Sequence, residues 1–451
     1  MERLTKIIKM DMIPALGVTE PGAIAFATSR ARSYTKGEIK KVNIYLNSGI
    51  YKNAFTCGIP NSTQVGNIFS AALGAVAGKW EKGLLSLEDI NEDDNKKAQK
   101  LIDEHKIFVH LDRIDSEIYI RAVVETNEDT CEVIIKNHHT DICQIKLNNN
   151  IIFKKEDNKV NDKENTSQNE ISEITNYTIE DFYNYCSTVD INEISFLKNA
   201  YNVNMELFKE GQCSNRAKIV KQLIKSNKNK VISKDEIKTS QVLTGGAIEA
   251  RVIGLNKPAM SITGSGAHGI ICTMPLYSCY KVNEFTEEQL LRATALSYLI
   301  TMYIKEYSGR LSAFCGCAIA AGTGMACALV FMKNGTIEQM KYTINNMASS
   351  ITGMICDGGN VGCVMKGIVA VDAAYRSIEL AMNNIYIEDI HGINGKTPEE
   401  TMRYMGMIAS PGMKETEKTI LDIFTQKSSN GLRSQLLYNF LKCFICSFKI
   451  E

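Results

Sequence analysis

The sequence predicts an α+β fold, in which an N-terminal region of helices and sheet precedes a mainly helical region rich in alanine and glycine. Three observations lead to this prediction. Short runs of alternating apolar residues, typical of strands, are confined to residues 1–153. A polar stretch follows at residues 154–175, and apolar residues then recur at helical spacing within residues 176–427. With 451 residues, 44% of them hydrophobic, the chain can form two such domains, and residues 428–451 add an apolar tail.

The N-terminal region begins with two predicted helices. Residues 2–12 carry apolar side chains at helical spacing and run into Pro14, where we expect a loop, and a short apolar helix starts with Ala23 to Ala27. Alternating apolar residues then predict strands at Val42 to Leu46, Ile107 to Leu111, Ile118 to Val124, Glu132 to Ile135 and Ile142 to Ile152. These elements together predict a sheet with covering helices.

Residues 154–175 differ in composition from their surroundings. The stretch starts with Lys154, Lys155, Glu156 and Asp157, continues with Asn, Asp, Ser and Gln, and is nearly free of large apolar side chains. Such a segment buries too little surface to offset the conformational entropy lost on ordering. We therefore predict a polar linker or an insertion.

The second region is predicted to consist mainly of helices. Thr286-Glu287-Glu288 is a helix start signal, and an apolar stripe follows it. The run Ala318 to Val330 is rich in Ala and Gly, so neighbouring helices can approach it closely. Amphipathic spacing predicts further helices over Ile337 to Ile355 and Val364 to Ala381.

The overall charge argues against large anionic partners. Lys plus Arg and Asp plus Glu both total 51, so the net charge is zero and no global field attracts nucleic acid or an anionic membrane. No apolar run is long enough to span a bilayer, and the N-terminus lacks the apolar core of a signal peptide. Fourteen cysteines without a secretion signal indicate a reducing compartment, and we expect a cytoplasmic protein.

Three of the cysteines are candidate metal ligands. Cys315, Cys356 and Cys363 each lie at a predicted helix boundary in a glycine-containing loop, where backbone amides can bond to the sulfides of an iron-sulfur cluster. Thiolates favour such clusters or zinc over hard cations, but the spacing is not that of a zinc finger. On spacing alone, ordinary buried thiols are the favoured interpretation.

Ordered motifs then extend over nearly the whole chain up to about residue 425. They are Pro14 to Pro21, Lys52-Asn53, Glu249-Ala250-Arg251, Ser261 to Pro275 with Gly264-Ser265-Gly266, Arg310 to Cys315, and Gly353 to Lys366. In this combination the sequence resembles the L-cysteine desulfidase family, which is related to the α subunit of bacterial iron-sulfur L-serine dehydratases. Several motifs in a fixed order are much more specific than any one of them.

The resemblance implies a 4Fe-4S cluster held by Cys315, Cys356 and Cys363, with Cys317 the rival for the first position. Three ligands leave one iron open to act as a Lewis acid. The implied reaction is α,β-elimination, most directly from L-cysteine to pyruvate, ammonia and sulfide, or from L-serine with loss of water. Such chemistry needs no pyridoxal phosphate, and we expect none.

One position departs from the family. The Gly-Cys-Thr-Glu-Pro motif, whose cysteine is thought to accept a proton, reads Gly17-Val18-Thr19-Glu20-Pro21 in this chain. Valine cannot accept a proton. Either another group does so, with Glu20 the nearest candidate if burial raises its pKa, or the substrate differs, or the chain is a non-catalytic relative that binds the cluster. A helix-capping role for Glu20 is equally open.

Candidate substrate-binding residues come from two places. Lys52 and Asn53 follow a predicted strand and could hold a substrate carboxylate, or could form a solvated strand end. Ser265 and His268 belong to a glycine-containing loop whose amides and hydroxyl could hold an anion. Glu249 and Arg251 would share one face of a strand, as a structural ion pair or as a substrate contact.

The tail departs from the family as well. It contains Cys443-Phe444-Ile445-Cys446 within a helical apolar stripe, so we expect it to dock onto the body or onto a second subunit. Redox activity, metal binding or access to the cluster are alternatives. For the whole chain we expect a small amino-acid substrate, no nucleic-acid or membrane partner, and assembly into a homo-oligomer.

Overall fold

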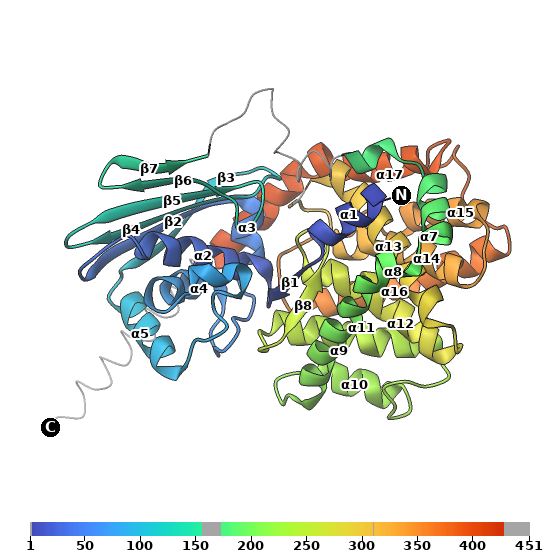
Figure 1. Cartoon of the computed structure of the whole chain (residues 1–451), viewed down its shortest axis with the longest axis horizontal. Helices are drawn as coiled ribbons and strands as arrows, with labels where there is room; N and C mark the ends of the chain where they lie inside the picture. The colour runs from blue at the N-terminus through green and yellow to red at the C-terminus, as the bar shows by residue number, and fades with distance from the viewer. Residues whose placement is uncertain (1, 156–172, 310, 428–451) are drawn as a thin grey trace.

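The computed structural model describes residues 2–155, 173–309 and 311–427. A region of sheet and helices lies beside a larger region that is almost entirely helical (Figure 1). This arrangement confirms the predicted fold class. The buried apolar residues form two hydrophobic cores, one under the sheet and one among the helices of the larger region. Most of the predicted linker and the whole predicted tail, with Cys443 and Cys446, fall outside the described residues.

A six-stranded sheet forms the N-terminal region, with strand order β3-β2-β4-β5-β6-β7. Its strands are β2 (Ile39–Asn47), β3 (Ile107–Arg113), β4 (Tyr119–Thr126), β5 (Thr130–Lys136), β6 (Ile142–Leu147) and β7 (Asn150–Lys154). Strand β2 runs parallel to β3, whereas the other neighbours are antiparallel. The run predicted as one strand over residues 142–152 is a hairpin of two strands, because Asn148 and Asn149 both adopt a positive φ and turn the chain.

Helices cover one face of this sheet (Figure 1). The N-terminal region contains α2 (Thr19–Arg32), α3 (Ser48–Asn53), α4 (Gly66–Val76), η1 (Trp80–Leu85) and α5 (Glu92–Asp103). The alternation in β2 buries Val42, Ile44 and Leu46 completely in the core under these helices. Helices α2 and α4 pack so closely that a Cβ at Gly74 would lie 2.6 Å from the carbonyl oxygen of Ala25.

The segment after the first helix is a strand and not the predicted loop. Strand β1 (Ile13–Leu16) pairs antiparallel with β8 (Pro258–Ser261), which joins the start of the chain to the helical region. Helix α1 (Glu2–Asp11) also belongs there, because Leu4, Ile7 and Ile8 are buried in the larger core. The sequence did not predict β1, since a four-residue strand containing a proline has no local signal and its partner is remote in sequence.

The helical region begins at residue 173. Its helices are η2 (Glu173–Asn176), α7 (Ile179–Thr188), α8 (Ile191–Ile194), η3 (Ser195–Leu197), α9 (Lys198–Cys213), α10 (Ile219–Ser226), α11 (Glu236–Val252), α12 (Gly266–Val282), α13 (Glu287–Ser308), η4 (Cys317–Ala321), α14 (Gly322–Met332), α15 (Ile337–Ile351), α16 (Gly362–Met382), α17 (Pro398–Met407) and η5 (Ile408–Gly412). The predicted start at Thr286 is confirmed by a capping box with Gln289. Helix α15 ends at Ile351, earlier than predicted, and an irregular loop leads from there to α16.

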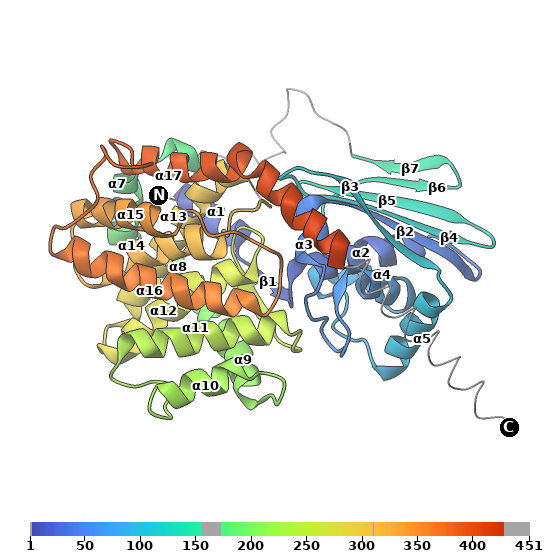
Figure 2. The same cartoon turned by 180° about the vertical axis from the view of Figure 1, so that it is seen from behind.

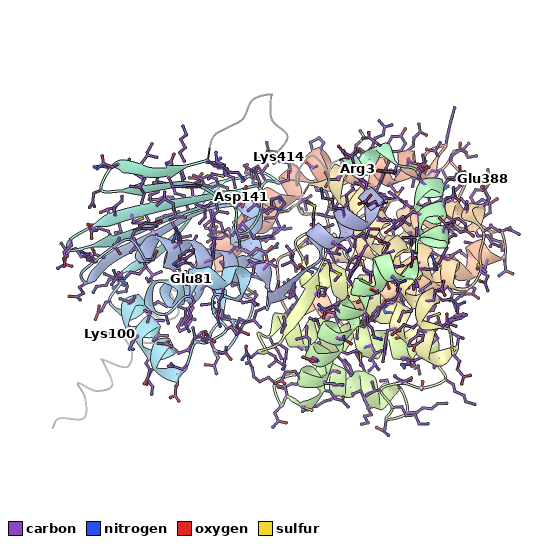
Figure 3. All side chains as sticks on the ribbon, in the orientation of Figure 1. Arg3, Glu81, Lys100, Asp141, Glu388 and Lys414 are labelled. Atoms are coloured by element: carbon purple, nitrogen blue, oxygen red, sulfur yellow. The ribbon has the colours of Figure 1, made fainter. Side chains whose placement is uncertain are left out.

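The last described helix, residues 414–427, returns to the N-terminal region (Figure 2). The ring of Phe424 stacks on that of Phe55, with 4.5 Å between their centroids. Charged side chains such as Glu81, Lys100 and Glu388 lie exposed on the outside of both regions (Figure 3). Among the helices of the described ranges, none is sufficiently long and apolar to cross a membrane.

Candidate active site

Two loops bring Cys315 and Cys356 side by side. The backbone N–H of Cys315 donates to the carbonyl of Met354 at 3.0 Å, and that of Cys356 donates to the carbonyl of Ala313 at 2.6 Å. These bonds form an isolated antiparallel bridge between the segment before η4 and the segment before α16. Thiols that are far apart in the sequence therefore sit on adjoining backbone.

Cys363 completes the group at the first turn of α16. Its thiol donates to the carbonyl of Gly358 at 3.4 Å, within the same loop as Cys356. The three thiols lie close enough to influence one another. Burial is the largest cause that raises the pKa of Cys363 to about 12, and the neighbouring Cys356 and Cys315 also raise it. Burial first, and then Cys315, raise the pKa of Cys356. The rival Cys317 is half-buried, and its thiol is hydrogen-bonded to that of Cys315.

The loop between Cys356 and Cys363 is pressed against the N-terminal region. Gly358 has φ +98°, and a Cβ there would lie 2.4 Å from the carbonyl oxygen of Lys52. Gly359 donates its N–H to the carbonyl of Asn53 at 3.2 Å, and a Cβ at Gly359 would lie 2.8 Å from Val18. Only glycine fits both positions without displacement. Val18, which replaces the cysteine of the family motif, is thus buried directly against this loop.

The chemistry of the donor set fits an iron-sulfur cluster. Cys315, Cys356 and Cys363 provide three thiols from two glycine-containing loops. The positive charge of Lys366 lowers the pKa of all three thiols and so favours the thiolate form that binds metal. Yet the described side chains contain no group of three or more His, Cys, Asp or Glu already arranged to hold a metal ion. The thiols are near one another but would have to turn toward a common centre.

A small cavity of about 130 Å³ adjoins this group and is lined by both regions. Asn53 and Glu20 line it from the N-terminal region, and Ser265, His268 and Cys356 line it from the helical region. It is much smaller than the cavities of about 300–1,000 Å³ that hold drug-sized ligands. A ligand of this cavity would therefore be a small molecule.

Glu20 is fixed in the cavity wall as an anion. It lies in the first turn of α2, 4% exposed, and accepts hydrogen bonds from Asn53 Nδ2 at 2.8 Å and from the Thr19 hydroxyl at 2.9 Å. Burial would raise the pKa of Glu20, but His139, Asn53 and Arg251 together lower it to about 2. The condition under which Glu20 could accept a proton at neutral pH, a pKa raised by burial, is therefore not met.

His268 is held as a neutral imidazole. Its Nδ1 lies 2.5 Å from the Thr263 hydroxyl, and a Cβ at Gly316 would lie 2.8 Å from its Nε2. Burial, followed by the charges of Lys305 and Arg251, lowers the pKa of His268 to about 3. The ring therefore suits hydrogen bonding beside the Cys315 loop better than acid–base exchange at neutral pH.

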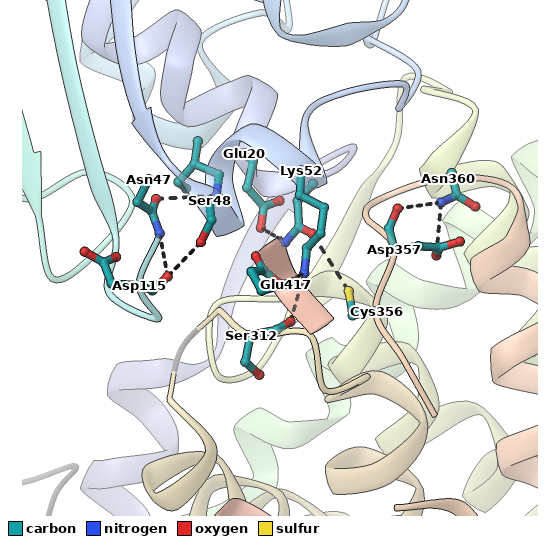
Figure 4. A network of polar contacts seen from close by, with 12 residues as sticks. Glu20, Asn47, Ser48, Lys52, Asp115, Ser312, Cys356, Asp357, Asn360 and Glu417 are labelled. Carbon is teal, nitrogen blue, oxygen red and sulfur yellow. Dashed lines mark hydrogen bonds and ion pairs between the residues drawn. The ribbon is translucent and has the colours of Figure 1, made fainter. Parts of the chain in front are cut away.

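Lys52 lies away from the cavity lining. Its ammonium donates to Glu417 Oε2 at 2.6 Å and to the carbonyl of Ser312 at 3.0 Å (Figure 4). Lys52 is 1% exposed and belongs to α3, so the alternative of a solvated strand end is wrong. Asn53, by contrast, lines the cavity, and the thiol of Cys356 lies 3.9 Å from its Oδ1. The two neighbours, predicted to act together, therefore have different surroundings.

Ser265 lies where the chain enters α12. It occupies the N-cap position, yet its side chain makes no capping hydrogen bond, and it lines the cavity. The preceding Gly264 has φ +75°, a conformation that favours glycine. The predicted loop is therefore the N-terminus of a helix of 17 residues, whose free amides and dipole favour an anion.

Glu249 and Arg251 lie on helix α11 and not on the predicted strand. Glu249 accepts the backbone N–H groups of Lys218, Ile219 and Val220 and so caps α10. No ion pair joins it to Arg251 in the described part of the chain. A helix that is buried on all sides has no apolar periodicity, which explains why the sequence did not distinguish it from a strand.

The sequence did not identify two residues of this site, His139 and Glu417. His139 lies in the turn between β5 and β6, lines the cavity and is 7% exposed. Glu417 pairs with Lys52 from the last described helix. Neither belongs to a local motif, and each meets its partner only in the folded chain. The adjacent pair His138-His139 in a polar turn was the only available sign.

Comparisons with known proteins identify the family of the chain. The chain matches the serine dehydratase alpha chain family over residues 81–422. A UPF0597 protein of Clostridium botulinum (strain Okra) is 39% identical over 430 residues, covering 94% of this chain and 99% of that protein. UPF0597 proteins of Caldanaerobacter subterraneus and Clostridium tetani are 36% and 34% identical over 424 residues, again covering 94% of this chain and 98% of each relative. The chain therefore belongs to the serine dehydratase alpha chain family.

Proposed function

We propose that this chain is an iron-sulfur-dependent lyase that catalyses α,β-elimination of a small β-substituted amino acid, with L-cysteine as its substrate. The observation that carries the proposal is the meeting of Cys315, Cys356 and Cys363 on two paired loops beside a small cavity. The overall reaction converts L-cysteine and water into pyruvate, ammonia and sulfide. We place it in the reducing cytoplasm, on account of the fourteen cysteines.

The three thiols would hold a 4Fe-4S cluster, which supplies a Lewis-acid iron when bound. The chain's own residues bind and orient the substrate around it. The free backbone amides at the N-terminus of α12, with Ser265, favour binding of the substrate carboxylate. The anionic Glu20, which also lines the cavity, favours binding of the positively charged amino group of the substrate. Asn53 and His268 add hydrogen-bonding groups that fix the orientation.

Two alternatives remain tied to specific observations. The family to which the chain belongs favours L-serine as a substrate, with water leaving in place of sulfide. Val18, buried at the cluster loop where the family motif has a proton-accepting cysteine, favours a relative that binds the cluster without catalysis. Both alternatives share the cluster and the cavity with the main proposal, and one experiment separates all three.

The experiment is an amino-acid panel with protein reconstituted under anaerobic conditions. Pyruvate, ammonia and sulfide are measured for L-cysteine, and pyruvate and ammonia for L-serine. We expect L-cysteine to be cleaved faster. A higher kcat/KM for L-serine would identify the dehydratase, whereas absence of elimination in the wild type, together with activity in Val18→Cys, would identify the non-catalytic relative.

Cys356→Ala tests the cluster itself. We expect loss of the broad visible absorbance and of most iron and sulfide, because this cysteine lies where the backbones of the two loops are hydrogen-bonded and also lines the cavity. Cys213→Ala removes an exposed thiol at the end of α9 and is the matched control, which should retain full iron. Full iron and sulfide in Cys356→Ala would reject the ligand assignment.

A further inference from the structure

We propose that His139 is the group that removes the α-proton of the substrate, and that Glu20 positions it. This inference rests on the proposed function and names the proton acceptor within it. The thiol that would do this in the family motif is absent, because Val18 stands at its position. Another group at the same cavity must then accept the proton.

The geometry singles out His139. Its Nε2 is buried and has no hydrogen-bond partner among the described residues, yet it lies 3.9 Å from Glu20 Oε1. The ring also lies near Gly264, where a Cβ would be 3.4 Å from His139 Cε1. The imidazole thus lies between the first turn of α2 and the entrance to α12, and its Nε2 faces the Glu20 carboxylate at the cavity that Cys356 also lines.

The other ionisable groups of the cavity suit the role less well. Both oxygens of Glu20 already accept hydrogen bonds, and its low pKa makes it a weak proton acceptor. The Nδ1 of His268 lies against Thr263, and its pKa is lowered to about 3. Asp11, His138 and Lys305 also face the cavity and already have partners.

The pairing of the His139 imidazole with the Glu20 carboxylate gives each residue a role in the reaction. When the substrate Cα–H bond breaks, its proton passes to His139 Nε2 and its electron pair forms the Cα=Cβ bond. The Cβ–S bond breaks at the same time, and the sulfur leaves as hydrosulfide with the electron pair of the Cβ–S bond. The imidazolium so formed is stabilised by the negative charge of Glu20 and then returns the proton to the leaving sulfur or to water. Glu20 is therefore a positioning residue and His139 a catalytic one.

The test begins with His139→Ala and His139→Gln in cluster-loaded protein. We expect kcat for L-cysteine to fall about 10²- to 10⁴-fold, with iron content, visible spectrum and melting temperature as in the wild type. His391→Ala removes the side chain of an exposed histidine in the loop between α16 and α17 and is the matched control, with unchanged kcat. Loss of activity accompanied by loss of iron or folding in both His139 variants would overturn the assignment.

Chemical rescue tells whether His139 acts as a proton acceptor or only fills space in the cavity. Added imidazole should restore kcat to His139→Ala in a concentration-dependent manner, because it fits the space and accepts a proton. The ring of 1,2,4-triazole has the same shape but is a much weaker base, so it should not rescue. Equal rescue by both rings, or His139→Ala within tenfold of the wild type, would reject His139 as the proton acceptor. A wild type that cleaves no amino acid would instead reject the proposed function and this inference with it.

Discussion

The ammonium of Lys52 lies 2.6 Å from Glu417 Oε2, and both side chains are buried, with 0% and 6% of their surfaces exposed. This pair joins α3, directly after the second strand, to the helix of residues 414–427. The backbone of Lys52 in turn touches Gly358 of the cysteine loop. One buried ion pair therefore holds together the N-terminal region, the last described helix and the wall of the proposed cluster site.

Breaking this pair on one side should destabilise the chain strongly. We expect Lys52→Met to lower the free energy of unfolding by about 3–5 kcal/mol, because it leaves the Glu417 carboxylate buried without its partner. The double variant Lys52→Met/Glu417→Met should recover most of the loss. Urea unfolding of cluster-free protein measures both. Lys414→Met, exposed on the same helix, should change stability by less than about 0.5 kcal/mol. A double variant as unstable as the single one would contradict this explanation.

Glycine in the cysteine loop should be required at Gly358 and dispensable at Gly353. Gly358→Ala places a Cβ 2.4 Å from the carbonyl of Lys52 at a positive φ, so the loop must move. We expect a loss of about 1–3 kcal/mol in stability and of much of the iron bound per chain. A Cβ at Gly353 would meet nothing within 4 Å, so Gly353→Ala should bind iron normally. Equal iron content in the two variants would refute the close approach.

Cys315 and Cys317 should differ as ligands. The backbone of Cys315 is bonded to Met354, which fixes it beside Cys356, whereas Cys317 begins a separate turn, η4. We expect Cys315→Ser to lose most iron and sulfide on anaerobic reconstitution, and Cys317→Ser to retain them. Iron analysis and visible absorbance measure the difference. The opposite result would move the first ligand position to Cys317.

The acid stability of the chain should depend on Glu20. Its pKa falls from the ordinary value of 4.5 to about 2 in the folded chain, so the ionised form stabilises the fold. This contribution, roughly 3 kcal/mol, is fully present above pH 4.5 and is lost as the pH falls toward 2. In Glu20→Gln, the free energy of unfolding should therefore fall less steeply between pH 5 and 3, while iron content at neutral pH stays intact. Parallel slopes for variant and wild type would show that Glu20 is not held as an anion. Glu81→Gln, an exposed change, is the control.

Local patterns predicted most of the fold. The alternation at Val42 to Leu46 and the cap at Thr286 indicate structure through side-chain period and hydrogen bonding to neighbouring backbone, both of which are properties of a few consecutive residues. The pairing of β1 with β8 has no such local cause. Helix α11 was missed for a different reason, because its burial on every side removes the contrast between two faces.

The candidate site shows the same division. The glycine-containing loops around Cys315 and Cys356 are visible in the sequence, and the structure brings them into contact. The residues that surround Glu20 could not be predicted from the sequence. Its pKa depends on His139, Asn53 and Arg251, which come from three other elements, and burial alone would have given the opposite direction.

The pairing of β1 with β8 also sets an order of events during protein synthesis. The first strand is made early, but its partner at Pro258–Ser261 emerges from the ribosome only after more than half of the chain, and Glu417 emerges later still. The cavity therefore cannot form, nor can the cysteine loops settle against α3, until Glu417 has been synthesised. Loading of iron and sulfide is then expected to follow synthesis of Glu417, and a product truncated before this residue should remain unloaded.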